Sequence, residues 1–213
     1  PKIKVLLVNG EASDNWFDDE GHWFGLAVSS TDSSPFSLQT IDPAELSAAA
    51  MRQSDVVALL NVGELRSSQS AALSEYVLNG GSLLIAPGDK VDERAFNQQL
   101  GEISPARLEQ VGLLGRDDYL VIADYDRRHP ILRPLGSDWS ARFQGHWRLT
   151  PSEDAKVLMQ FDNTEAALVE NDVGEGKVLL FASSLDLEWN NLALQGLFLP
   201  FVHETLRHLV RSE

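Results

Sequence analysis

The stretch YVLNGGSLLIAPGD, residues 76–89, carries the signals that decide the fold. Asn79-Gly80-Gly81 is typical of a left-handed helix end, and the apolar run 82–86 that follows has the length of one strand. Pro87-Gly88-Asp89 then stops the strand with turn residues. A continuously apolar strand that directly follows a helix is typical of a parallel sheet with helices on both faces.

The same alternation extends from this stretch toward the N-terminus. Apolar strands are predicted at 3–8, 36–41 and 55–61, and helices at 19–29, at 44–52 and from Ser67 or Ser68 onward. Asp42-Pro43 is a favourable helix start because the aspartate can cap and proline fits the first turn. Strands and helices in this order predict an α/β fold, a flavodoxin-like parallel sheet with right-handed crossovers, in a single domain over residues 1–213.

The C-terminal half predicts antiparallel additions to that sheet. Strand candidates are residues 141–149, 156–161, 166–170 and 177–182, with a hairpin turn at 172–176 between the last two. Apolar residues from Phe198 to Val210 recur at helical spacing. Pro200 is tolerated only near the start of that helix, so we expect a break around residues 196–200.

Composition excludes several classes of protein. Lys and Arg total 17 against 32 Asp and Glu, a formal net charge of −15, which repels phosphate backbones and makes nucleic acid an unsuitable partner. No apolar run approaches the roughly 20 residues that cross a bilayer, so we expect no membrane insertion by this chain. The absence of cysteine excludes disulfides, thiolate metal sites and a cysteine nucleophile.

Four segments resemble the class I glutamine amidotransferase-like fold: residues 5–10, 54–62, 76–89 and 174–200. The last contains the pattern GxGKVLLFASSLDxxW at 174–189. More closely, the chain resembles the amidotransferase-like domain of bacterial membrane proteins with a BatA-like N-terminal segment and often a von Willebrand factor A domain. This resemblance implies a domain cut from an inner-membrane protein, located in the periplasm, with protein partners at or near the membrane.

The catalytic residues of that family are missing here. Amidotransferases place a nucleophilic cysteine on the turn after the strand that corresponds to 83–86, and the thiolate attacks the glutamine amide. This chain has Pro87-Gly88-Asp89 at that turn, and the later loop 183–188 lacks the family's histidine. The sequence therefore predicts a non-catalytic binding or scaffolding domain, with no catalytic residues and no cofactor.

Ligand sites of open α/β sheets lie beyond the carboxyl ends of the strands. Four loops qualify: 9–20, 61–64, 87–92 and 183–189. Rigid aromatic rings next to charges suit a protein interface, so we predict a binding surface on these loops. Its candidate residues are Asp14, Trp16, Asp89, Asp186, Glu188 and Trp189.

Two alternatives remain for the same loops. Their carboxylates could hold Ca²⁺ or Mg²⁺ in a metal-assisted hydrolase, although calcium-loop spacing is absent and no metal is predicted. Exposed tryptophans could instead stack on sugar rings in a sugar-binding domain. Elsewhere, Asp124, Asp126 and His129 could form a metal or acid–base set. The favoured interpretation is that His129 fixes a turn by hydrogen-bonding to the neighbouring backbone, while His203 and His208 are expected to be partly exposed.

Overall fold

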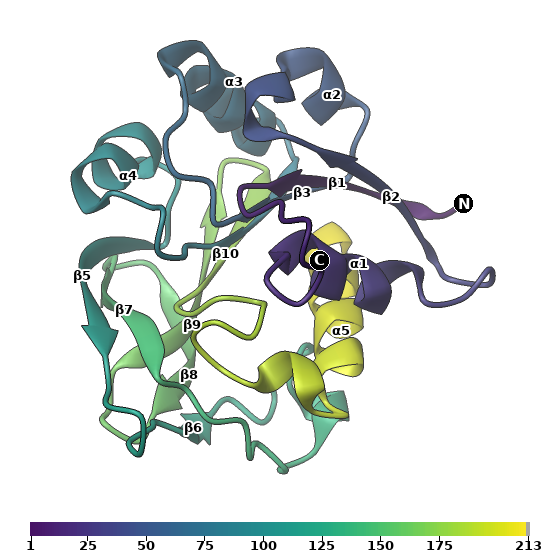
Figure 1. Ribbon diagram of the computed structural model, residues 1–213. Helices are drawn as coiled ribbons and strands as arrows, with labels where there is room; N and C mark the ends of the chain where they lie inside the picture. Colours follow the sequence, from purple (N-terminus) through teal and green to yellow (C-terminus); the bar gives the residue numbers. More distant parts are fainter. Residues whose placement is uncertain (212–213) are drawn as a thin grey trace.

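The computed structural model describes residues 1–211, which form a central mixed sheet with helices on both faces (Figure 1). Eight strands pair in the order β2-β1-β3-β4-β10-β9-β8-β6. Strands β2, β1, β3, β4 and β10 run parallel, and β9, β8 and β6 add antiparallel. Their bounds are β1 (Ile3–Asn9), β2 (Phe36–Ile41), β3 (Val56–Leu60), β4 (Ser82–Ala86), β6 (Ile122–Tyr125), β8 (Lys156–Phe161), β9 (Ala166–Val173) and β10 (Gly176–Phe181).

This architecture confirms the predicted fold class, a flavodoxin-like, amidotransferase-like sheet with antiparallel strands near the C-terminus. One departure is the separate two-stranded sheet of β5 (Ala106–Leu113) and β7 (Gly145–Pro151). The mixed pattern at 107–122 concealed β5 because its residues alternate only partly between buried and exposed. A second departure is the predicted helix 44–52. It divides into a 3-10 turn (Pro43–Glu45) and α2 (Ala48–Arg52), because Ser47 caps a new helix by accepting the Ala50 amide.

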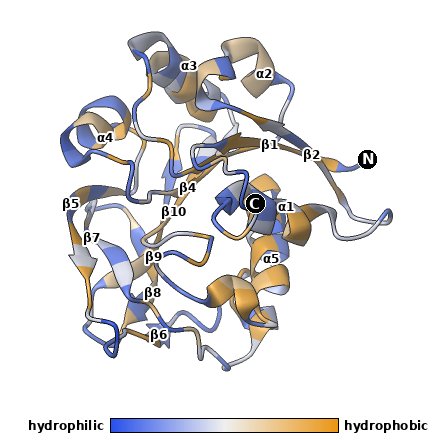
Figure 2. Cartoon of the chain, in the orientation of Figure 1, coloured by the Kyte–Doolittle hydropathy of each residue, from blue (hydrophilic) through white to orange (hydrophobic). Residues whose placement is uncertain are grey.

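The helices cover the two faces of the sheet in separate groups. Helices α1 (Glu20–Ser29) and α5 (Phe198–Val210) lie together on one face in Figure 1, and α2, α3 (Ser67–Leu78) and α4 (Glu93–Leu100) lie on the other. Alternate residues of β1 divide accordingly. Val5 and Leu7 pack with the α1 and α5 side, whereas Leu6 and Val8 pack with α2, α3 and α4. Figure 2 shows the apolar residues gathered along the central strands between these layers.

Local signals explain where several elements begin. Asp19 accepts the His22 amide at 3.1 Å at the start of α1, and Asp92 accepts the Ala95 amide at 2.9 Å at the start of α4. Pro200 lies in the first turn of α5, as its missing amide requires. No helix in residues 1–211 has both the length and the apolar character needed to cross a membrane.

Candidate functional site

The loops that follow β1, β3, β4 and β10 meet at the carboxyl edge of the sheet, and Asn61 joins three of them. Its side-chain amide donates to Glu11 Oε2 at 2.7 Å and to Asp89 Oδ1 at 2.8 Å. Its carbonyl oxygen accepts the Lys90 amide at 3.0 Å. Asn61 is almost fully buried, so this side chain holds two carboxylates at a fixed separation at the edge of the core.

The backbone around Asn61 is built for close approach. Asn61 adopts a left-handed conformation with φ of 50°, which is uncommon for a residue other than glycine and often marks functional sites. A Cβ atom on Gly10 would stand 1.9 Å from the Asn61 carbonyl oxygen, and one on Gly88 would stand 2.5 Å from Asn61 Cγ. Both glycines therefore let the neighbouring loops approach Asn61, Gly10 against its backbone and Gly88 against its side chain.

A fourth loop joins through a buried acid that the sequence did not single out. Glu20, in the first turn of α1, is completely buried, and its Oε1 accepts the Leu185 amide at 2.7 Å. Its Oε2 has no hydrogen-bond partner among the described residues. Burial, and then the charge of Asp186, raise the pKa of Glu20 well above its ordinary value. Burial therefore favours the protonated form of Glu20, and a protonated carboxyl group can donate a hydrogen bond.

Two further carboxyls in the last loop also retain protons more strongly than usual. Asp186 is buried; its Oδ1 accepts the Glu188 amide at 3.0 Å, and burial raises its pKa. Partial burial, followed by the charges of Asp89 and Asp186, raises the pKa of Glu188 to about 7. Glu188 is exposed, so its position leaves it available to a ligand or to solvent.

Negative charge at this edge is poorly compensated. Lys90 forms an ion pair with Glu11 at 3.2 Å and also donates to the Gly10 carbonyl at 3.0 Å. Among residues 1–211, no other lysine or arginine forms an ion pair with Glu11, Glu20, Asp89, Asp186 or Glu188. The surplus disfavours anionic ligands, whereas hydroxyl, amide and cationic groups remain suitable.

An exposed aromatic cluster lies in the first of these loops and the start of α1. Trp16 and Phe17 stack with ring centroids 3.7 Å apart, and both are close to half exposed. Trp16 also contacts His22 and Trp23, while Trp23 donates from its indole nitrogen to the Phe17 carbonyl. Hydrogen bonds hold this loop beside the carboxyl cluster, because Glu11 accepts from Asn61 at 2.7 Å and Asp19 accepts from Asn9 at 2.8 Å.

The structure brings some predicted site residues together and separates others. Asp89, Asp186 and Glu188 share the cluster, and Trp16 lies in the adjoining loop. Asp14 is exposed in the same loop and forms no hydrogen bond or ion pair with these carboxyls. Trp189 does not face solvent: it is buried, and its ring packs directly against Gly145. The predicted pair of tryptophan anchors is therefore reduced to Trp16.

Four residues contribute to the candidate site but were not predicted from the sequence: Asn9, Glu11, Glu20 and Asn61. Asn9 donates to Asp19 at 2.8 Å and accepts the Glu11 amide at 3.1 Å. The sequence did contain one signal, because an asparagine stands at the end of each of the apolar strands β1 and β3. An asparagine side chain can both donate hydrogen bonds to a neighbouring loop and accept them from it. Glu20 gave no signal of its own because an acid in a first helical turn is ordinarily a surface feature.

Other sites differ from this one in chemistry. In residues 1–211 only one group of three His, Asp or Glu side chains brings its ligand atoms within 4.8 Å of one another, and it lies between β9 and α5 rather than at this edge. A cavity of about 740 Å³ opens at the opposite, amino edge, lined by Tyr76, Gly81 and Lys177 among others. The cavity thus lies at the amino edge of the sheet, whereas the cluster of carboxyl groups lies at the carboxyl edge. We place the candidate site by chemistry, because converging acids with raised pKa are the better functional indicator.

No family model matches the chain, and no curated protein is similar to it in sequence. Solved structures match its fold closely. A cytoplasmic protein of Salmonella typhimurium matches with a TM-score of 0.79 and 16% identity over 100% of both chains. A second cytoplasmic protein of that organism gives 0.76 and 18% over 97% of this chain and 99% of the other. A protein of Bacteroides uniformis described as ThuA-like gives 0.73 and 13% over 99% and 92%. At these identities the similarity establishes the fold.

These comparisons correct the predicted location. The expectation of a periplasmic domain of an inner-membrane protein is wrong, because the two Salmonella structures that match nearly end to end are described as cytoplasmic proteins. The comparisons likewise provide no support for the resemblance to BatA-like and von Willebrand factor A proteins.

Proposed function

We propose that this chain is a binding module for a small, neutral, hydroxyl-rich molecule, held at the carboxyl edge of the sheet. The observation that carries this proposal is the group of acids with raised pKa, Glu20, Asp186 and Glu188, beside the exposed Trp16. Partly protonated carboxyls both donate and accept hydrogen bonds, as paired hydroxyl groups require. The aromatic faces of Trp16 and Phe17 suit the apolar face of a sugar or polyol ring.

The chemistry of the edge favours this ligand over the alternatives. The carboxylate surplus disfavours an anion, and the carboxyl oxygens do not gather as metal ligands do. A protein interface is less favoured because Trp189 packs inside the molecule and leaves Trp16 as the exposed anchor of the predicted pair. The turn Pro87-Gly88-Asp89 offers no nucleophile for amide transfer, so binding rather than glutaminase chemistry is proposed.

A ligand panel tests this proposal. Tryptophan fluorescence and thermal shifts would be measured with neutral mono- and disaccharides, cyclic polyols, the matching uronic acids and polyamines. We expect saturable binding of at least one neutral compound and at least tenfold weaker binding of its uronic acid. Trp16→Ala and Asp186→Asn should each weaken binding at least tenfold.

Matched variants control for nonspecific effects. Tyr119→Ala removes a comparably exposed aromatic ring that lies over Arg142, and Glu102→Gln removes an exposed carboxylate just after α4. Neither should change affinity. Preference for a uronic acid or for a polyamine would contradict a neutral ligand. Binding that survives both Trp16→Ala and Asp186→Asn would move the site elsewhere.

A further inference from the structure

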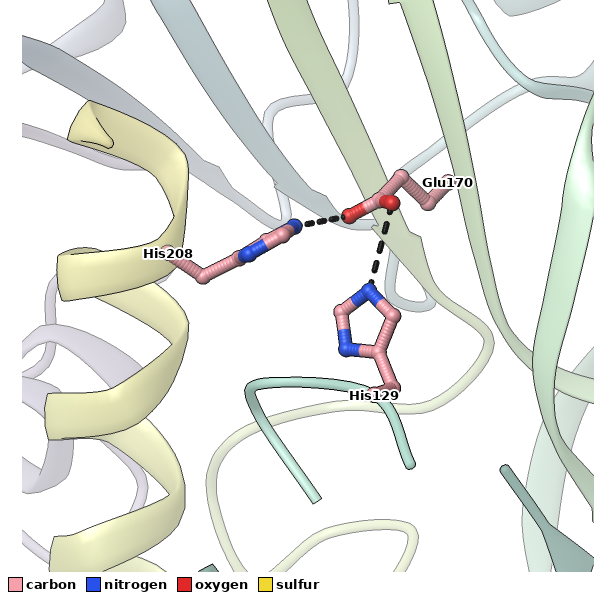
Figure 3. A group of neighbouring side chains, drawn as sticks. All are labelled: His129, Glu170 and His208. Carbon is pink, nitrogen blue, oxygen red and sulfur yellow. Dashed lines mark hydrogen bonds and ion pairs between the residues drawn. The ribbon is translucent and has the colours of Figure 1, made fainter. Parts of the chain in front are cut away.

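Three ligand-type side chains meet on the face of the sheet that α5 covers, away from the carboxyl-edge cluster (Figure 3). His129 comes from the turn after β6, Glu170 from β9 and His208 from α5. His129 Nε2 lies 3.2 Å from Glu170 Oε1, and His208 Nε2 lies 2.5 Å from Glu170 Oε2. One ligand atom from each residue lies within 4.8 Å of the other two.

These three side chains are buried, and one of them, Glu170, is a carboxylate, which is seldom found in the interior of a protein. The three side chains are 7% to 10% exposed, and His208 is thus buried rather than partly exposed as its position on the last helix predicted. In residues 1–211 the ion pairs of Glu170 involve these two histidines and no lysine or arginine. Lys156, opposite Glu170 in β8, is itself exposed. With both histidines neutral, the buried carboxylate has two hydrogen bonds but no opposite charge, and a bound cation would supply that charge.

The donor set selects the class of cation. Two imidazole nitrogens and one carboxylate oxygen suit borderline ions such as Zn²⁺, Co²⁺ or Fe²⁺, whereas Ca²⁺ and Mg²⁺ prefer all-oxygen sites. Ligands about 2.0–2.2 Å from a tetrahedral zinc ion stand roughly 3.3–3.6 Å apart. The observed 3.2 and 2.5 Å separations involve different oxygens of Glu170, and one ligand atom from each residue lies within 4.8 Å of the other two, so the three side chains would rearrange around a single ion. Burial opposes ionisation of Glu170, but hydrogen bonds from His129 and His208 hold its pKa below the usual range.

We propose that His129, Glu170 and His208 form a binding site for one divalent transition-metal ion of the zinc class. The three ligands come from segments far apart in sequence, so the ion would fasten α5 and the 126–132 turn to β9. Three protein ligands leave a fourth coordination position to water or another small ligand.

Metal binding requires the imidazole proton of His129 to move from one ring nitrogen to the other. Its Nδ1 accepts the Ile131 amide at 3.2 Å, so the neutral ring carries its proton on Nε2 and donates it to Glu170. An ion on Nε2 displaces that proton, and the neutral ring then holds its proton on Nδ1, facing the Ile131 amide. The Ile131 hydrogen bond must therefore open when the ion binds, which gives the site a local reporter.

The test uses chelator-treated full chain titrated with Co²⁺ and Zn²⁺. We expect one equivalent per chain, the visible absorption of four-coordinate Co²⁺, a rise in melting temperature with Zn²⁺, and a large shift of the Ile131 amide NMR signal. Glu170→Gln and His208→Asn should each weaken binding at least 100-fold. His22→Asn, which removes a histidine beside the carboxyl-edge cluster, should leave it unchanged.

Substoichiometric binding by the folded chain would overturn the proposal and leave the three residues as a hydrogen-bonded clamp. Binding that Glu170→Gln and His208→Asn retain but His22→Asn abolishes would place the ion at the carboxyl edge instead. If either core variant fails to fold, the Co²⁺ spectrum and the Ile131 signal of the unaltered chain decide.

Discussion

At the scale of single residues, the candidate site depends on side chains whose roles arise only from tertiary contacts. Asp186 and Glu188 were identifiable because they follow an apolar strand, and the fold brings them to the same edge as Asp89. Burial of Trp189 could not be read from the sequence. It results from Gly145, far away in the chain, which leaves room for the indole ring. Asn61 was likewise hidden, because its partners Glu11 and Asp89 are 50 and 28 residues distant.

The raised pKa of Glu188 predicts a pH-dependent stability. Its pKa of about 7 in the folded chain exceeds the roughly 4.3 of an unfolded glutamate, so proton binding favours the folded state. This stabilisation is complete below about pH 4.3 and is lost as the pH rises through about 7. We expect Glu188→Gln to raise the melting temperature at pH 8 more than at pH 5.5. The gain should stay below about 1 kcal/mol because solvent screens this exposed group.

Differential scanning calorimetry at the two pH values measures this effect, with Glu102→Gln as the control. An equal change at both pH values, or a loss of stability at pH 8, would show that Glu188 does not retain its proton in the folded chain.

At the scale of elements, continuous apolar strands were the most predictable feature. Strands β1, β3, β4 and β10 all fall within a residue or two of their predicted ends, because strands buried on both faces leave an unbroken apolar run. Strands β5 and β7 were harder to locate, since they form a small sheet of their own with one face partly exposed. Their pattern lacks the strict alternation or the apolar run on which strand prediction relies.

The central position of β10 predicts a large cost for truncating its core residues. Leu180 is fully buried in the layer beneath α3, so Leu180→Ala should lower the free energy of unfolding by about 2–5 kcal/mol. Leu113→Ala provides the matched control, because Leu113 is 69% exposed and should change stability by less than about 0.5 kcal/mol. Chemical denaturation measures both. A loss below about 1 kcal/mol for Leu180→Ala would be inconsistent with a doubly covered strand.

At the scale of the whole molecule, the sequence predicted the fold class correctly and the location wrongly. The order of strands and helices specifies a flavodoxin-like sheet, and the structural matches share it at 13% to 18% identity. Location was inferred from a resemblance to membrane proteins, and shared architecture does not carry location or function. The same holds for the candidate site. The fold brings its loops together, but it does not determine which residues those loops carry.

The whole chain is also predicted to lack glutaminase activity. It contains no cysteine, and the turn after β4 is Pro87-Gly88-Asp89, whereas glutamine amidotransferases place a nucleophilic cysteine on the corresponding turn. We expect ammonia release from glutamine to equal the buffer background at any protein concentration. Release that rises with protein concentration and disappears on unfolding would refute this expectation.

NMR chemical-shift mapping would distinguish a ligand at the carboxyl edge of the sheet from one bound elsewhere. The neutral ligand that binds best would be titrated into ¹⁵N-labelled chain. We expect the largest amide shifts at Glu11, Leu185 and Glu188, whose backbone or side chains form the cluster. Shifts concentrated instead at Tyr76, Gly81 and Lys177, around the 740 Å³ cavity at the amino edge, would contradict this expectation.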